Sequence, residues 1–135
     1  AQRREQLAGK VVVDITNPVN FETFNSLVVP ADSSAAAQLA AALPESRVLK
    51  AFNTTFAGTL ATGTVGGNRT TVLVAGDDAA AKATLIDAIT AGGAVDAVDA
   101  GALARARELE AVGFLQILLA AGEKVSWTGG FAVVR

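Results

Sequence analysis

The stretch GKVVVDITNPVN, residues 9–20, decides how this sequence is read. Apolar and β-branched residues run from Val11 into Asp14, two more follow, and Asn17-Pro18 ends the run. A run without strict alternation predicts a strand over 10–16 that is buried on both faces, as in a parallel sheet. That strand would end in a polar tip, although an Asn-Pro pair is also a turn starter in its own right.

Helix and strand signals alternate along the rest of the chain. Strands are predicted in RVLKAFN (47–53), TTVLVAG (70–76) and AVDAVDAG (94–101), and helices over 34–43, 79–91 and 103–121. This alternation predicts an α/β fold in three layers with a mostly parallel sheet. The strand at 70–76 follows the previous one without a long crossover helix, so it can run antiparallel to it. The tail at 125–135 could add a final β segment.

The first elements also carry end signals. AQRREQLAGK reads as the last turns of a helix that closes at Gly9. Ser33 or Ser34 can cap the helix that ends before Pro44, and Asp77 or Asp78 can cap the next one.

Composition excludes several classes of function. The chain has 135 residues with a net charge of −2, and we expect residues 1–135 to form one domain. It has no basic stripe and no set of stacking aromatics, so we expect no nucleic-acid partner. Cysteine and histidine are both absent, which leaves no thiol nucleophile, no imidazole base and no Cys- or His-built metal site. No apolar run is long enough to cross a bilayer and no signal peptide is visible, so we expect no membrane partner and a cytoplasmic location.

Two neighbouring strands are predicted to end in uncharged polar residues. The first ends in Asn17-Pro18 and the second in Asn53-Thr54-Thr55. In open α/β sheets, ligands bind beyond the carboxyl ends of parallel strands, so these tips can face a ligand crevice. Amides and hydroxyls suit a neutral planar ligand better than a phosphate or a metal. The alternative is structural: the first tip starts a turn and the second caps a short helix.

Four segments in order, VVVDITNP, VLKAFNTTFAG, VLVAGDD and VDAGALARARELE, resemble the coenzyme F420-dependent NADP oxidoreductase family, whose relatives include the cytoplasmic domain of the STEAP ferric reductases. The resemblance covers nearly the whole chain. It implies a Rossmann-type fold with NADP over the strand ends and a deazaflavin (F420) or flavin ring stacked on the nicotinamide for hydride transfer. It also implies that Asn17 and Pro18 border the nicotinamide and that Asn53, Thr54 and Thr55 form the floor of the pocket. No catalytic side chain and no metal are implied, because the cofactors carry the chemistry.

The resemblance places DITNP in the middle of the family's dinucleotide-binding domain, after strands and a Gly-rich phosphate turn. This sequence contains no Gly-x-Gly-x-x-Gly. We therefore expect a partial NAD(P)-binding domain that lacks the first βαβ half, and a chain that by itself is inactive and binds NADP(H) weakly or not at all. The alternative is a non-catalytic α/β assembly or binding module without dinucleotide binding.

The last predicted helix has an unusual composition. Its segment 111–121 is apolar on nearly every face, so it is either deeply buried or packed on a second subunit. We expect a symmetric homodimer through this helix or through an exposed edge at 10–16. Arg107 and Glu110 match the family pattern, and their spacing also predicts an ion pair within the helix. Trp127 and Phe131 either lie near the second cofactor, as the resemblance implies, or form an apolar cluster that anchors the tail.

Overall fold

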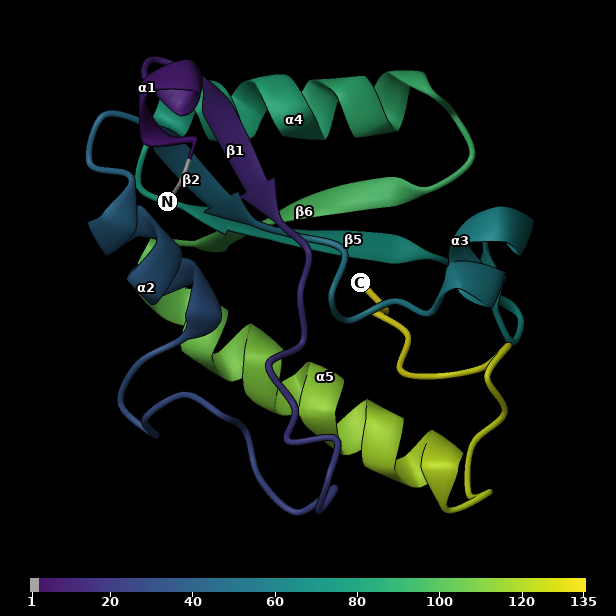
Figure 1. Cartoon of the computed structure of the whole chain (residues 1–135). Coiled ribbons are helices and arrows are strands. Elements are labelled where there is room, and N and C mark those ends of the chain that lie inside the picture. The colour runs from purple at the N-terminus through teal and green to yellow at the C-terminus, as the bar shows by residue number, and fades with distance from the viewer. Residues whose placement is uncertain (1–2) are drawn as a thin grey trace.

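A computed structural model describes residues 3–135, and Figure 1 shows its arrangement. The main sheet has the strand order β1-β2-β5-β6, with bounds Val11–Asp14, Arg47–Lys50, Thr71–Gly76 and Asp96–Gly101. The pairs β1·β2 and β5·β6 are parallel, whereas β2 and β5 are antiparallel. The predicted reversal of direction at the third strand is therefore confirmed.

Helices cover both faces of this sheet (Figure 1). Helix α4 (Ala79–Ala91) packs on one face, and α2 (Ala35–Ala42) and α5 (Ala106–Ala121) lie on the other. Each face has its own apolar core. One is built around Ala36, Val48 and Ala106, and the other around Val72 and Val74. The predicted three-layer, Rossmann-like α/β fold is confirmed.

The smaller elements complete the chain. Helix α1 (Arg4–Leu7) precedes Gly9, whose φ is +70°; the predicted start of this helix at residues 1–2 lies outside the described residues. Helix α3 (Ala57–Thr62) is followed by a short hairpin of β3 (Thr64–Val65) and β4 (Asn68–Arg69). This hairpin is not among the strands that the sequence predicts.

Two of the predicted caps are present. Ser34 Oγ accepts a hydrogen bond from Ala37 N at 2.9 Å at the start of α2. Asp78 Oδ1 accepts one from Ala81 N at 2.8 Å at the start of α4. These side chains satisfy backbone N–H groups that have no partner within the helix, which explains where both helices begin.

Three expectations about secondary structure are wrong. Strand β1 is not fully buried on both faces: Val12 and Val13 pack against opposite cores but are only partly buried, and Val11 is 38% exposed. The tail 125–135 forms no strand. The last helix does not start as an α-helix, because Leu103–Arg105 is a 3₁₀ turn that precedes α5. Within residues 3–135, none of the helices has the length and apolarity needed to cross a membrane.

Candidate functional site

Two asparagines at the ends of neighbouring strands hold each other. Asn17 Nδ2 donates to the backbone oxygen of Asn53 at 3.1 Å, and Asn53 Nδ2 donates back to Asn17 Oδ1 at 3.1 Å. The two residues follow β1 and β2, which are parallel, so their carboxyl ends meet at one edge of the sheet. The structure thus brings together the two polar tips that the sequence singles out.

Helix α5 lies directly against this pair. Asn53 Nδ2 makes its second donation to Leu109 O at 2.9 Å. One turn further along, Gly113 faces the same pair: a Cβ added there would lie 2.3 Å from Asn17 Oδ1 and 2.8 Å from Asn53 O. Only glycine allows the helix to approach the asparagines this closely.

The two asparagines differ in what they can offer a ligand. Asn53 is 4% exposed, both its amide hydrogens are used, and its Oδ1 is the buried side-chain atom without a hydrogen-bond partner among the described residues. Asn17 is half-buried and uses one amide hydrogen and one lone pair. Asn17 therefore keeps one donor and one acceptor for another molecule, whereas Asn53 supports it from behind.

The other predicted site residues also divide into half-buried ones, like Asn17, and buried ones, like Asn53. Pro18 and Thr55 are half-buried, and Thr55 Oγ1 donates to Phe52 O at 3.3 Å. Thr54 is only 7% exposed.

Phe52, between β2 and Asn53, has φ +66°, a conformation that is costly for a residue with a side chain. Such strain is typical of functional sites.

A buried cluster of charged residues, which the sequence analysis did not find, lies beside these tips. Lys50, the last residue of β2, is fully buried. Its Nζ donates to Asp14 Oδ2 at 3.1 Å, to Glu110 Oε1 at 2.9 Å and to the backbone oxygen of Thr16 at 2.6 Å. We call Lys50, Asp14 and Glu110 the Lys50 cluster. Its three acceptors match the three N–H donors of an ammonium group.

The two carboxylates of the Lys50 cluster have further partners. Asp14 Oδ1 accepts from Thr16 N at 2.9 Å and from Thr16 Oγ1 at 2.7 Å. Glu110 accepts from Ala35 N at 2.9 Å and from Ala36 N at 3.2 Å, the first two residues of α2. The partial positive charge at this helix end favours the second carboxylate in a cluster that has one cation.

The predicted ion pair between Arg107 and Glu110 is wrong. Glu110 points inward to Lys50, and Arg107 Nη2 instead contacts Glu108 Oε1 at 2.8 Å. The hydrogen bond from Arg107 lowers the pKa of the exposed Glu108 carboxyl, and the same contact raises the pKa of Arg107. These surface charges lie outside the candidate site.

Helix α5 buries two of its polar side chains, Glu110 and Gln116, on its inner face. Glu110, Gly113 and Gln116 are buried at intervals of three residues, whereas Val112 and Leu115 are 38% and 50% exposed. Of the two alternatives for segment 111–121, complete burial within this chain is therefore wrong, and packing on a second subunit stays a prediction. The inner face contacts the strand tips, and some of the apolar side chains of the helix remain exposed.

Gln116 joins the second strand tip to the tail. Its Nε2 donates to Thr54 O at 3.1 Å, and its Oε1 accepts from Phe131 N at 2.9 Å. Gly130 lies so close that an added Cβ would be 2.6 Å from Gln116 Oε1. The tail is thus fixed on the helix that contacts the site.

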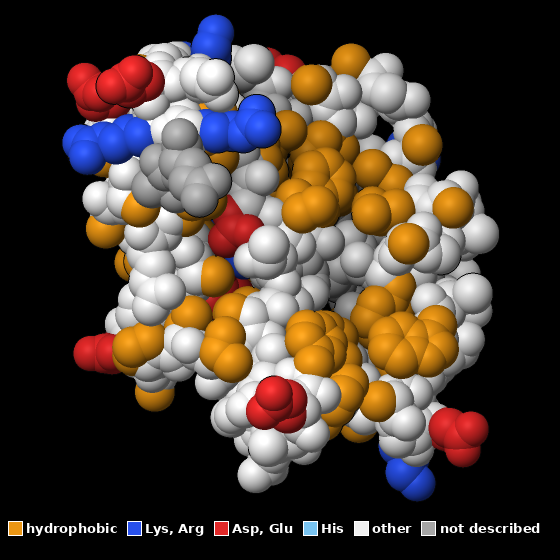
Figure 2. All heavy atoms as spheres, viewed as in Figure 1, with side chains coloured by type: hydrophobic (Ala, Val, Ile, Leu, Met, Phe, Trp, Pro, Cys, Tyr) orange, Lys and Arg blue, Asp and Glu red, His pale blue; other side chains and the backbone are white. Residues whose placement is uncertain are grey.

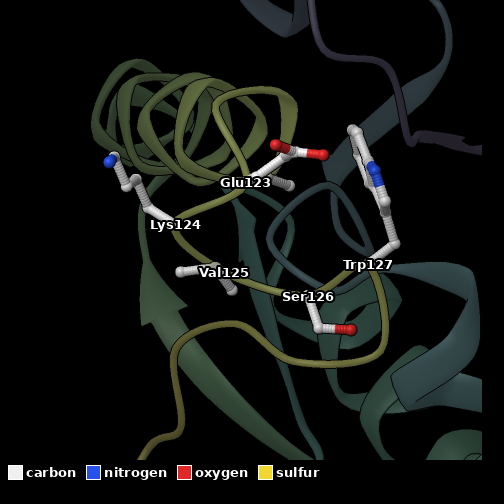
Figure 3. A pocket seen from close by; sticks show the side chains of 6 residues that line it. Glu123, Lys124, Val125, Ser126 and Trp127 are labelled. Atoms are coloured by element: carbon white, nitrogen blue, oxygen red, sulfur yellow. The ribbon is translucent and has the colours of Figure 1, made fainter.

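The first part of the tail surrounds a pocket of about 420 Å³, lined by Ala120 and residues 123–127. In Figure 3 the Glu123 side chain points toward Trp127, and Lys124 points away. The Trp127 ring lies 5.0 Å from the ring of Phe56, centroid to centroid. Trp127 therefore anchors the tail on the segment before α3, and no strand-tip asparagine lines this pocket.

The described part of the chain has no group of three or more acidic residues placed to hold a metal ion. The strand tips offer amides, a hydroxyl and a proline ring. This chemistry fits a neutral polar ligand that both donates and accepts hydrogen bonds.

Comparisons with known proteins identify relatives of this chain. The chain is 41% identical over 108 residues, 80% of its length, to metalloreductase STEAP3 of Rattus norvegicus, of which it covers 21%. The structure matches the crystal structure of a proposed F420-dependent NADP reductase from Arthrobacter sp. FB24 with a TM-score of 0.86 and 32% identity, over 100% of this chain and 62% of that one. It also matches a hypothetical protein of Sinorhizobium meliloti with a TM-score of 0.63 and 28% identity, over 72% of this chain and 47% of that one.

A scan of family models gives no match. The chain spans less than two thirds of the relatives named above. Nevertheless, the similarity to the reductase extends over this whole chain, and the sequence match to STEAP3 extends over most of it. The predicted resemblance is therefore confirmed: the chain is related to the F420-dependent NADP oxidoreductases and to the STEAP metalloreductases.

Proposed function

We propose that this chain supplies the nicotinamide-facing part of an NADP(H)-dependent oxidoreductase. Asn17, Pro18 and Thr55 form the surface toward the cofactor, and Asn53 and Thr54 lie beneath them as support. The observation that carries the proposal is the reciprocal pairing of Asn17 and Asn53 at the ends of two parallel strands.

The hydrogen-bonding capacity of Asn17 fits the nicotinamide group. A carboxamide needs one acceptor for its N–H and one donor for its oxygen, and Asn17 keeps one of each after its bonds to Asn53. The support by Asn53 fixes the orientation of this amide before a ligand binds, which lowers the ordering cost of binding.

When bound, the cofactors supply the redox chemistry, a hydride exchanged between NADP(H) and a deazaflavin such as F420 or a flavin. The chain contributes position: Pro18 and Asn17 would hold one face of the nicotinamide and leave the other open to the second ring. The absence of histidine and cysteine is compatible with this role, since hydride transfer needs no protein acid or base. The similarity to a proposed F420-dependent NADP reductase and to a metalloreductase supports a reduction reaction.

The affinity for NADP(H) should be low. The printed sequence holds no Gly-x-Gly-x-x-Gly turn, and the pyrophosphate of a dinucleotide is normally bound by such a turn at a helix N-terminus. We expect a dissociation constant on the order of 1 mM, which corresponds to contacts at the nicotinamide end alone.

A homodimer is the proposed assembly. Val112 and Leu115 are exposed on the outer face of α5, and Val11 and Ile15 are 38% and 60% exposed at or just beyond the edge strand β1. Hydrophobic side chains also gather on the face shown in Figure 2, with most charges toward its rim. Apolar surface of this kind and an unpaired strand edge both favour association with a second copy.

Titration of the ¹⁵N-labelled chain with reduced nicotinamide mononucleotide and with NADPH tests the site. The backbone amides of Asn17 and Thr55 should shift with both ligands. Asn17→Ala should abolish the shift at Thr55, while the control Asn68→Ala, at an exposed position in the β3–β4 hairpin, should retain it.

A second measurement tests the reaction. The chain by itself should not accelerate the reduction of F420 or of riboflavin by NADPH. Mixed with a separately expressed Gly-rich dinucleotide-binding half, it should accelerate that reaction, and Asn17→Ala should remove the acceleration. If millimolar ligand shifts no amide near Asn17 or Thr55, the proposal is wrong and the non-catalytic binding module is the better description.

A further inference from the structure

We propose that Lys50 is a positioning residue for Asn17: it fixes the backbone from which the ligand-facing amide projects. The inference concerns the same site as the proposed function and rests on it for the identity of the ligand. The role of Lys50 itself can be tested without any ligand.

The contact of Lys50 with Thr16 carries the inference. Lys50 Nζ donates at 2.6 Å to the carbonyl oxygen of Thr16. That carbonyl and the nitrogen of Asn17 belong to one planar peptide group. A bond to the oxygen therefore fixes the orientation of the peptide that begins Asn17.

Asp14 fixes the preceding peptide. Its Oδ1 accepts from Thr16 N at 2.9 Å, and its Oδ2 accepts from Lys50 at 3.1 Å. Both peptide planes that flank Thr16 are thus held by the Lys50 cluster. The chain has no regular backbone pairing to do this, because β1 ends at Asp14.

Stability alone is a poor explanation for the Lys50 cluster. Burying an ammonium group and two carboxylates carries a large desolvation penalty, and apolar replacements of buried ion clusters are often neutral or stabilising. A fully hydrogen-bonded cluster does define one geometry. Here the cluster fixes the backbone that leads into Asn17, and Asn53 holds the Asn17 side chain.

The test compares a neutral variant of the cluster with a matched control. Asp14→Asn, Lys50→Met and Glu110→Gln together remove all three charges, and the two amides keep acceptors for Thr16 N and for the start of α2. The control is Lys82→Met with Asp99→Asn. Lys82, on α4, donates to Gly76 O at 3.1 Å and Gly101 O at 2.9 Å and contacts Asp99 Oδ1 at 2.9 Å, so it is a second lysine that holds strand ends.

The readout is the side-chain NH₂ signal of Asn17 in the ligand-free chain. In the neutral variant its heteronuclear NOE should fall toward that of exposed Asn25, while Asn53 keeps its bond to Leu109 and stays rigid. The control variant should leave both signals as in the wild type. An unchanged Asn17 signal in the neutral variant, or an equal change in the control, overturns the inference.

A milder variant keeps the test decisive if the triple variant does not fold. Lys50→Met with Asp14→Asn leaves Glu110 bonded to Ala35 N and Ala36 N, removes the bond from Lys50 to Thr16 O, and should loosen Asn17 in the same direction. If the Asn17 signal is as rigid as in the wild type, the inference fails.

A ligand titration then separates the two proposals. If reduced nicotinamide mononucleotide binds the wild type, the neutral variant should bind it about tenfold more weakly, the loss expected for one misplaced amide contact. If the wild type does not bind it, the proposed function fails, and the NOE comparison still decides whether Lys50 positions Asn17.

Discussion

Gly113→Ala should destabilise this chain although it places a better helix former inside a helix. An added Cβ would lie 2.3 Å from Asn17 Oδ1, 2.8 Å from Asn53 O and 3.0 Å from Asn53 Nδ2. None of these atoms can move away freely, because each belongs to the hydrogen-bonded pair or to its backbone. Either α5 shifts outward or Asn17 separates from Asn53.

The magnitude follows from three contributions. Overpacking in a dense interior costs about 1–3 kcal/mol. Separating the asparagines removes two hydrogen bonds, each worth about 1 kcal/mol. The better helix propensity of alanine returns about 1 kcal/mol. The free energy of unfolding should therefore fall by about 2–4 kcal/mol.

Urea unfolding followed by far-UV circular dichroism measures this change. Ala111→Gly, at an exposed position of the same helix, is the control for propensity and should cost about 1 kcal/mol. Asn17→Ala makes room for the new methyl group, so the double variant Asn17→Ala with Gly113→Ala should be more stable than the sum of the single effects predicts.

Two results would refute this reasoning. If Gly113→Ala raises the free energy of unfolding, α5 does not lie against the asparagines. If its effect adds independently to that of Asn17→Ala, the contact between these two positions is absent.

The remaining predictions concern the charges and surfaces around the site. Asn53→Asp should lower the free energy of unfolding by about 1–3 kcal/mol more than Asn53→Ala, because an oxygen in place of Nδ2 would face two acceptors, Asn17 Oδ1 and Leu109 O. Equal losses in urea titrations would contradict the assigned orientation of the Asn53 amide. The hydrogen bond from Lys82 is the main cause of the lowered pKa of Asp99. The unfolded state therefore binds a proton at Asp99 more readily than the folded state does. The contribution of this contact to stability is present above about pH 4 and is lost as the pH falls further. Asp99→Asn should accordingly flatten the acid side of the stability profile, and an unchanged slope would show that this contact is negligible. Leu115→Glu should convert a dimer into a folded monomer in light scattering; a wild-type monomer at micromolar concentration would remove the proposed interface.

The fold was accessible from sequence because its signals are local. Side-chain caps at Ser34 and Asp78 and the short apolar runs define where helices and strands lie. The tips at Asn17 and Asn53 were found because polar residues directly follow such runs, and parallel strands bring their ends together.

The Lys50 cluster was not found because its members are far apart in sequence. Lys50 lies 36 residues from Asp14 and 60 from Glu110. Asp14 and Lys50 end apolar runs and Glu110 directly precedes one, positions where a solvated charge is equally reasonable. The single signal was a lysine inside the predicted strand RVLKAFN. Helix α5 differs from its expectation for a related reason: its apolar residues suggested burial, but Glu110, Gly113 and Gln116 are buried among its inward positions while Val112 and Leu115 are exposed.

These long-range bonds have a consequence for the order of folding. The contacts from α5 to the strand tips span 56 residues for Asn53 with Leu109, 60 for Lys50 with Glu110 and 62 for Thr54 with Gln116. Closing loops of this length is slow compared with forming a helix or a hairpin. During synthesis, all four strands of the sheet leave the ribosome before α5 does. Until α5 docks, Lys50 has Asp14 as a partner but lacks Glu110. The strand tips therefore acquire their geometry in the last step of folding, and a ligand for Asn17 can select only those molecules in which that step is complete.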